Sequence, residues 1–276
     1  MIKYKTFPFE IQKVQEDFLK RNLPFLKSLD SLGSACNIAI SNTPSQSIES
    51  RLILYLARMV FEDDFGSILI LCANGLSTGA MQILRGMFER TVTLSYLTKN
   101  QDQILLFWNY YWVDLHKIVE AIEREFPGRM VRETLEEIRV NYETVKKDYE
   151  ITDCKKCGTK RININWSKKN MIDMAKVAGF HVSLIQEGYY RPMEETHAKV
   201  GAFLRRVPSI DSEGVSYNGG PKPEEDKDTL IMAHWLVLIA LSIIRDAFSI
   251  EPLKGLIKKC ENDFRLAWNL EDEKVS

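Results

Sequence analysis

An arginine and a histidine stand close together in the string YYRPMEETH, where Arg191 precedes His197 with five residues between them. If both reach one phosphate, the arginine can stabilise a pentacovalent transition state and the histidine can move the protons. The 2′-hydroxyl of RNA is itself the nucleophile in that reaction, so no metal ion is required. The alternative is a core histidine, because His197 shares an apolar helical face with Met193 and Val200.

A second candidate pair follows twenty uncharged residues. Arg85 and Glu89 are spaced i, i+4 on a predicted helix, so they lie on one face and can pair. We expect both side chains to be largely buried, since burying either charge alone is costly. They either form a structural ion pair or line a polar pocket in which Arg85 binds an anion.

The segment CKKCG could hold a metal. Two thiolates two residues apart, Cys154 and Cys157, can occupy one edge of a tetrahedral zinc site. A closed site needs two more ligands, for which His181, Cys260 or the same pair from a second subunit are candidates. The alternative is a reduced cysteine pair, and we expect no other cofactor.

Basic residues follow the first cysteine without any acid between Cys154 and Ile172. Together with Trp166 they suggest a nucleic-acid surface, in which cations contact the backbone and the aromatic ring stacks on a base. The alternative is a solvated loop that balances the acidic stretch 143–153. The basic residues are Lys155, Lys156, Lys160, Arg161, Lys168 and Lys169.

Helical periodicity runs through almost all of the 276 residues, which predicts an all-α helical bundle forming a single domain over residues 1–276. The 37 basic and 38 acidic residues give a net charge of −1, which excludes a globally basic nucleic-acid binder. The start lacks the pattern of a signal peptide, and no stretch has the ~20 strongly apolar residues of a membrane span. We therefore expect a cytoplasmic protein without membrane contact.

Residues 102–150 have the clearest pattern. Two runs spaced 4-3-4-3-4, joined by Pro127-Gly128, predict a projecting antiparallel coiled-coil hairpin, with His116 outside its seam on the surface. Five aromatic residues between 107 and 112 exceed what one partner arm can cover, so the surplus must pack on the main body of the chain or on another chain. We expect a homodimer whose interface includes part of residues 102–150 or the helix at 190–205, or a partner protein bound to 102–150. The runs are Ile104, Trp108, Tyr111, Leu115, Ile118 and Ile122, then Val131, Leu135, Ile138, Tyr142, Val145 and Tyr149.

Turn signals divide the rest of the chain. Thr43-Pro44 predicts a helix start and Asn74-Gly75 its end. Residues 151–166 predict a small CxxC knuckle, to which we expect strands to be confined. A helix is predicted to begin at Pro192. Residues 207–228, rich in Gly and Pro, predict a flexible loop or a lid.

The pattern Arg-x(4–6)-His, here Arg191 and His197, resembles the signature of the HEPN (higher eukaryotes and prokaryotes nucleotide-binding) helical proteins. Many of these are RNases of toxin and defence systems. HEPN-like proteins commonly place this site at a dimer interface, so the resemblance also implies a homodimer. This chain departs from the HEPN pattern in having Pro192 directly after the arginine.

Residues 75–97, GLSTGAMQILRGMFERTVTLSYL, resemble the core helix of an uncharacterised bacterial family of all-helical proteins. The resemblance extends over about residues 45–205 and includes Trp166-Ser167 and Gly179-Phe180 downstream. It implies a helical fold and a polar cluster of Arg85, Glu89, Tyr190 and His197, and it implies no particular reaction. Met193 stands where that family usually has serine.

Three functions therefore stay open. The chain is an RNA-binding protein or a metal-independent endoribonuclease of a toxin or defence system, a non-catalytic helical scaffold, or a sensor of a nucleotide or small ligand. If Arg191 and His197 face one water-accessible cleft, catalysis by this pair is favoured, whereas a His197 sealed in the core favours the scaffold.

Overall fold

Helices make up nearly all of the regular structure, so the predicted all-α class is confirmed. The computed structural model describes residues 11–153, 157–196, 200–207, 209–211, 214–216 and 225–270. These residues form two compact units, one of residues up to Thr98 and from Ala175 onward, the other of Lys99–Met174. The predicted hairpin and knuckle both belong to the second unit.

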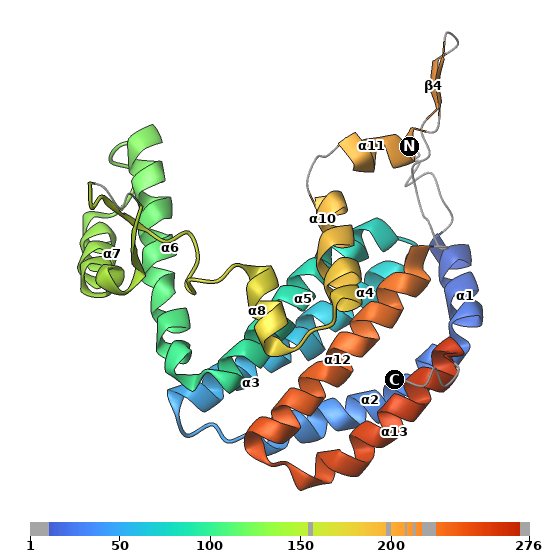
Figure 1. Cartoon of the computed structure of the whole chain (residues 1–276). Helices are drawn as coiled ribbons and strands as arrows, with labels where there is room; N and C mark the ends of the chain where they lie inside the picture. The colour runs from blue at the N-terminus through green and yellow to red at the C-terminus, as the bar shows by residue number, and fades with distance from the viewer. Residues whose placement is uncertain are drawn as a thin grey trace, which may run out of the picture. The chain divides into compact units, whose positions relative to one another are not determined.

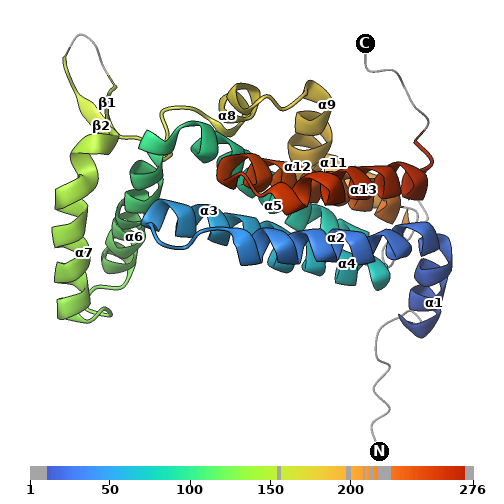
Figure 2. The same cartoon turned by 90° about the horizontal axis from the view of Figure 1, so that it is seen from below.

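The first unit is a helical bundle (Figure 1). Helix α12 packs against α4, α2 and α13, and α2 lies along α13 (Figure 2). The helices of this unit are α1 (Ile11–Arg21), α2 (Leu23–Asn42), α3 (Ile48–Arg58), α4 (Phe65–Ala73), α5 (Ser77–Lys99), α9 (Val182–Ile185), α10 (Arg191–Thr196), α11 (Val200–Arg206), α12 (Asp226–Phe248) and α13 (Glu251–Trp268). Helix α8 (Met171–Ala178) crosses the boundary between the units.

Helices α3 and α4 are joined by a π-helical segment, η1 (Met59–Asp64), whose flanking residues are also helical, so the chain forms one continuous helix from Ile48 to Ala73. The predicted start at Thr43 is wrong. The hydroxyl of Thr43 donates to the carbonyl of Ala39 at 2.7 Å and completes the preceding helix, while Ser47 caps α3 by accepting from the amide of Ser50. The predicted end at Asn74-Gly75 is confirmed, because Gly75 has a φ of 74°, which favours glycine.

Helix α12 is buried along most of its length. Among the residues that the structure describes, it alone is long and apolar enough to cross a membrane, by length and composition only. Core helices of soluble proteins pass the same test, so this is weak evidence for a span.

His234 of α12 lies in the core of the bundle, fully buried among aromatic rings. Its ring lies 5.6 Å from that of Phe25 and 4.9 Å from that of Phe264. Trp268 donates to Nδ1 at 3.4 Å, and Nε2 has no hydrogen-bond partner among the described residues. Burial lowers the pKa of His234 to about 4, against the weaker opposite effect of Asp263. His234 is therefore a neutral core histidine.

In the second unit α6 (Ile104–Glu125) packs against α7 (Arg132–Val145) (Figure 1). A short turn joins the two helices, and Gly128 in this turn has a φ of 72°. Its core consists of Tyr110, Val113, Val145 and Tyr149. Short 3-10 segments, η2 (Gln101–Gln103) and η3 (Lys146–Tyr149), precede α6 and follow α7. That this pair projects as a coiled coil stays a prediction.

The predicted seam of α6 is wrong, whereas that of α7 is largely confirmed. Ile138, Val145 and Tyr149 are buried as expected. On α6 Tyr110, Val113 and Val119, which lie to either side of that seam, are buried, and Trp108, Tyr111 and Ile118 are exposed. Both faces of α6 are apolar, so the heptad spacing alone could not identify the one that α7 covers.

His116 lies on the inward side as well, so its predicted surface position is wrong. Its ring stacks on that of Tyr142 of α7, with 3.7 Å between centroids and an interplanar angle of 8°. The side chain is largely buried and lies 3.8 Å from the carboxylate of Glu120. A histidine ring fills the space between the two helices in the same way as an apolar side chain.

Two short antiparallel hairpins contain the strands. β1 (Glu150–Thr152) pairs with β2 (Lys160–Ile162) in the predicted knuckle. β3 (Ser209–Asp211) pairs with β4 (Gly214–Ser216), with Ile210 opposite Val215. The expectation that strands are confined to the knuckle is therefore wrong, because cross-strand β-branched residues also favour pairing inside the predicted loop 207–228.

The buried neutral His234 predicts a stability that falls with acid. Its pKa of about 4 in the fold is below the ordinary 6.5, so the unfolded chain binds the proton first as the pH falls. The free energy of unfolding should fall by about 2 kcal/mol from about pH 7 to about pH 5, as urea titrations would measure. His181→Ala, at an exposed histidine, should leave this dependence unchanged. An NMR titration showing His234 with a pKa near 6.5 would contradict the prediction.

Candidate functional site

One face of α5 is polar within a helix that is otherwise buried. Thr78, Gln82, Arg85 and Glu89 follow one another at spacings of 4, 3 and 4 residues, so they lie on the same side. The rest of the helix contributes fully buried side chains such as Phe88 to the core. We call these four residues the polar stripe of α5.

The predicted pair of Arg85 and Glu89 is present. Nε of Arg85 donates to Oε1 of Glu89 at 3.0 Å. The expectation that both are largely buried is wrong for Glu89, because the side chains are 19% and 36% exposed. The stripe lies on the side of α5 that the apolar core leaves open, so water reaches the carboxylate.

A continuous helix, Val182–Thr196, runs past the polar stripe and contains a π-helical turn, η4 (Gln186–Tyr190). The predicted start at Pro192 is therefore wrong. The helix begins at Val182, where the ring of His181 accepts from the amide of Ser183 at 3.3 Å. Pro192 has no amide to donate inside a helix and crowds the preceding turn, and the widened π turn lies directly before it.

Gly188, in the π turn, lies directly against Phe88 of α5. A Cβ at this position would meet Cδ2 of Phe88 at 2.5 Å, a separation that real side chains essentially never show. Phe88 is fully buried and also packs edge-to-face on Phe180 at 5.7 Å. The absence of a side chain at residue 188 therefore sets how closely the helix approaches α5.

This close approach brings Tyr189 onto Arg85. The guanidinium carbon lies 5.0 Å from the centre of the Tyr189 ring, within the range of a cation–π interaction. Tyr190, which is 48% exposed, packs edge-to-face on Tyr189 at 5.5 Å. Of these two tyrosines only Tyr190 was a predicted site residue, although the doublet Tyr189-Tyr190 in the sequence was a signal for both.

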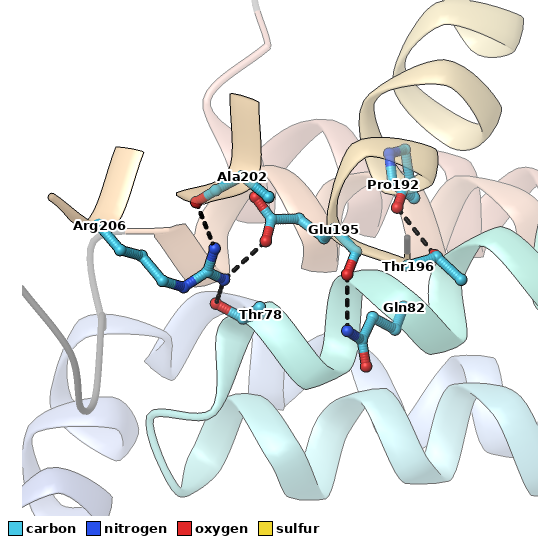
Figure 3. Close-up of polar contacts among 7 residues, drawn as sticks. All are labelled: Thr78, Gln82, Pro192, Glu195, Thr196, Ala202 and Arg206. Carbon is cyan, nitrogen blue, oxygen red and sulfur yellow. Dashed lines mark hydrogen bonds and ion pairs between the residues drawn. The ribbon is translucent and has the colours of Figure 1, made fainter. Parts of the chain in front are cut away.

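A second ion pair lies beside the stripe (Figure 3). Arg206 of α11 binds Glu195 of α10 at 2.6 Å, and the two side chains are 20% and 9% exposed. The same guanidinium donates to the hydroxyl of Thr78 and to the carbonyl of Ala202. Gln82 donates to the backbone carbonyl of Glu195 at 2.7 Å. This cluster was not predicted from the sequence, because Thr78 and Gln82 are far in the chain from Glu195 and Arg206.

Arg191 is held by two carboxylates. Its Nη1 donates to Glu187 at 3.0 Å and to Asp228 at the start of α12 at 2.9 Å. His197 lies outside the described residues, so its predicted role beside Arg191 stays a prediction. What the described residues bring together is Arg85, Glu89, Tyr189 and Tyr190.

The candidate zinc ligands are only partly described, because Cys154 lies outside the described residues. Cys157 lies 2.9 Å from the hydroxyl of Thr159. Cys260 is buried in α13, and His181 caps α9. Within the described parts of the chain, no group of three or more His, Cys, Asp or Glu side chains could hold a metal ion. Zinc at Cys154 and Cys157 stays a prediction.

The predicted basic surface is partly neutralised. Lys160 pairs with Glu150 at 2.9 Å and Arg161 with Asp153 at 2.7 Å. Both acids belong to the stretch 143–153, as the balanced-loop alternative predicts. Trp166 is partly buried, packs edge-to-face on Phe107 and contacts the core of the second unit. Lys168 and Lys169 are exposed, and Lys155 and Lys156 lie outside the described residues.

The contact at Gly188 predicts a large effect of one methyl group. Gly188→Ala should lower the free energy of unfolding by about 1–3 kcal/mol, because the methyl overlaps the ring of Phe88. Gly255→Ala in α13 is the matched control, since open space surrounds its Cβ and alanine favours the helix. Thermal melts of both variants would measure the difference, and equal melting temperatures would contradict the prediction.

The pair of Arg206 and Glu195 predicts a second difference in stability. Arg206→Met should cost about 2 kcal/mol or more, because it removes the cation from a carboxylate that is almost buried. Arg58→Met should cost less than about 1 kcal/mol, because Arg58 and its partner Glu62 are both exposed. Urea unfolding would compare the two variants, and a smaller loss for Arg206→Met than for Arg58→Met would contradict this.

Comparison with known proteins identifies one family. The model of a family of unknown function, DUF5677, matches residues 53–214, a range that includes the polar stripe and the helix that carries Tyr189. The expectation of an uncharacterised family is thereby confirmed, while its bacterial origin and the HEPN relation stay predictions. Searches of curated proteins and of solved structures found no significant match. Because the match spans more than half of the 276 residues of the chain, the chain belongs to the DUF5677 family.

Proposed function

We propose that the chain binds RNA at the row formed by Arg85, Tyr189 and Tyr190, and cleaves it without a metal ion. The observation that carries this proposal is the fixed position of Arg85. Its guanidinium is held by Glu89 at 3.0 Å and lies over the ring of Tyr189 at 5.0 Å. A cation held in this way is already oriented for a phosphate, so the arginine side chain loses little conformational entropy when the phosphate binds.

Tyr190 supplies the second element of an RNA site. It lies next to Tyr189 with about half of its surface exposed. Single-stranded RNA is bound by stacking its bases on aromatic rings while cations contact the phosphates. A base on Tyr190 would place the adjoining phosphate close to Arg85.

The charges around Arg191 make it a poor ligand for a phosphate. Arg191 donates to two carboxylates, Glu187 and Asp228, so these three groups together carry a net negative charge. A phosphate that approaches them is repelled.

The reaction that fits these groups is transesterification within RNA. The 2′-oxygen attacks the adjacent phosphorus and the bond to the 5′-oxygen breaks, which leaves a 2′,3′-cyclic phosphate and a 5′-hydroxyl. One proton leaves the 2′-hydroxyl and one reaches the departing 5′-oxygen. Arg85 stabilises the charge on the phosphate oxygens, and His197 is the candidate for proton transfer by its sequence position.

The test compares RNA binding and cleavage in matched variants. Arg85→Met should weaken binding of a fluorescent single-stranded RNA by about tenfold or more, while Arg58→Met, at an exposed ion pair, should bind as the wild type does. His197→Ala should retain binding and lose cleavage. Product ends carrying a cyclic phosphate would identify the reaction, and a wild type that neither binds nor cleaves RNA would overturn the proposal.

A sensor of a nucleotide or small ligand is the second candidate, because the same arginine and tyrosines can bind a mononucleotide. Calorimetry with mononucleotides, run beside the RNA assay, separates the two functions. Binding of a mononucleotide without RNA cleavage would favour the sensor. A toxin or defence role further predicts that expression in bacteria arrests growth for the wild type and not for His197→Ala.

A further inference from the structure

Helix α6 has a second apolar face that is exposed. Leu105, Trp108, Tyr111 and Ile118 are 51%, 52%, 59% and 56% exposed. Isolated apolar residues are common on protein surfaces, but these four follow one side of a single helix. We call these four, together with the partly exposed Leu115 and Ile122, the outer stripe of α6.

The inner face of α6 accounts for the other apolar residues of the helix. Tyr110 and Val113 belong to the core of the second unit together with Val145 and Tyr149. Phe107 packs edge-to-face on Trp166 at 5.2 Å. Tyr110 and Val113 thus lie on the side of α6 away from the outer stripe, whereas Phe107 lies beside the stripe.

The outer stripe has the spacing of a coiled-coil seam. Trp108, Tyr111, Leu115, Ile118 and Ile122 follow at 3, 4, 3 and 4 residues, with Leu115 and Ile122 partly exposed. The segment from Ile104 to Val113 contains no charged residue. A face of this kind fits another helix with the same repeat, rather than a nucleic acid or a charged ligand.

We propose that the outer stripe is the interface between two copies of this chain, with α6 of one copy packed on α6 of the other. The repeat that the interface requires is present on α6 itself, and a twofold axis brings one stripe onto the same stripe of the second copy. This self-association is independent of the proposed RNA site in the first unit.

The exposed area is sufficient for such a dimer. Large apolar side chains that are half exposed contribute on the order of 100 Å² each. The six residues of the stripe, two of which are only partly exposed, therefore offer about 500 Å² per chain. Two chains together would bury about 1,000 Å², the lower limit for a specific interface.

The mass of the full-length protein in solution tests the proposal. Light scattering and sedimentation equilibrium should give a dimer at about 10 µM. Trp108→Glu and Ile118→Glu should each raise the dissociation constant of the dimer at least about a hundredfold, because each variant places a charge in the apolar interface. Leu266→Glu, at a 75% exposed position of α13, is the matched control and should leave the dimer intact. Ile118→Ser provides a milder substitution if a glutamate variant does not fold.

A cross-link tests the geometry separately. Leu115 lies in the middle of the stripe, so Leu115→Cys should form a disulfide between two chains on mild oxidation if the pair is antiparallel about a twofold axis. Leu266→Cys should not. A wild type that stays monomeric at about 100 µM would overturn the proposal, and so would a dimer that persists in both Trp108→Glu and Ile118→Glu.

Discussion

At Gly188 the backbone of a π-helical turn lies directly against the ring of Phe88, and the space between them does not admit a methyl group. The contacts that reach α5 from the helix Val182–Thr196 depend on this approach. It places Tyr189 against Arg85, and about two turns after Gly188 the same helix carries Glu195, which binds Arg206. A side chain at residue 188 would push the helix away from α5. The contacts of Tyr189 and Glu195 would weaken together, because both residues lie on the same helix as residue 188.

The two arginines of α5 are held by two different π-helical segments. Asp64, at the end of the first, accepts from Nη1 of Arg90 at 2.7 and 2.8 Å, and Tyr189 of the second lies over Arg85. Burial raises the pKa of Asp64 even though the charge of Arg90 lowers it. A π turn widens the helix and redirects its side chains. This explains how Asp64 and Tyr189, which belong to two different continuous helices, both reach α5.

Helix α6 shows why a heptad spacing does not by itself identify the face that packs on a neighbouring helix. The spacing from Trp108 to Ile122 is that of a coiled-coil seam, but Tyr110 and Val113 form the core with residues of the α7 segment instead. From Ile104 to Val113 apolar residues occur on all sides, so this part of the helix has no charged side to fix its orientation. The ring of His116 completes the inner face by stacking on Tyr142, a role that its residue type alone did not indicate.

The sequence by itself determined the helical class, the end of the long helix at Gly75, and the pair of Arg85 and Glu89. These depend on contacts within a few residues, such as a left-handed glycine or an i, i+4 spacing, which local sequence specifies. Only the tertiary structure decided that Tyr189 covers Arg85, that Glu195 meets Arg206 and Thr78, and that Arg191 is bound by Asp228. The partners in these contacts come from distant parts of the chain, and packing at Gly188 sets the distances between them.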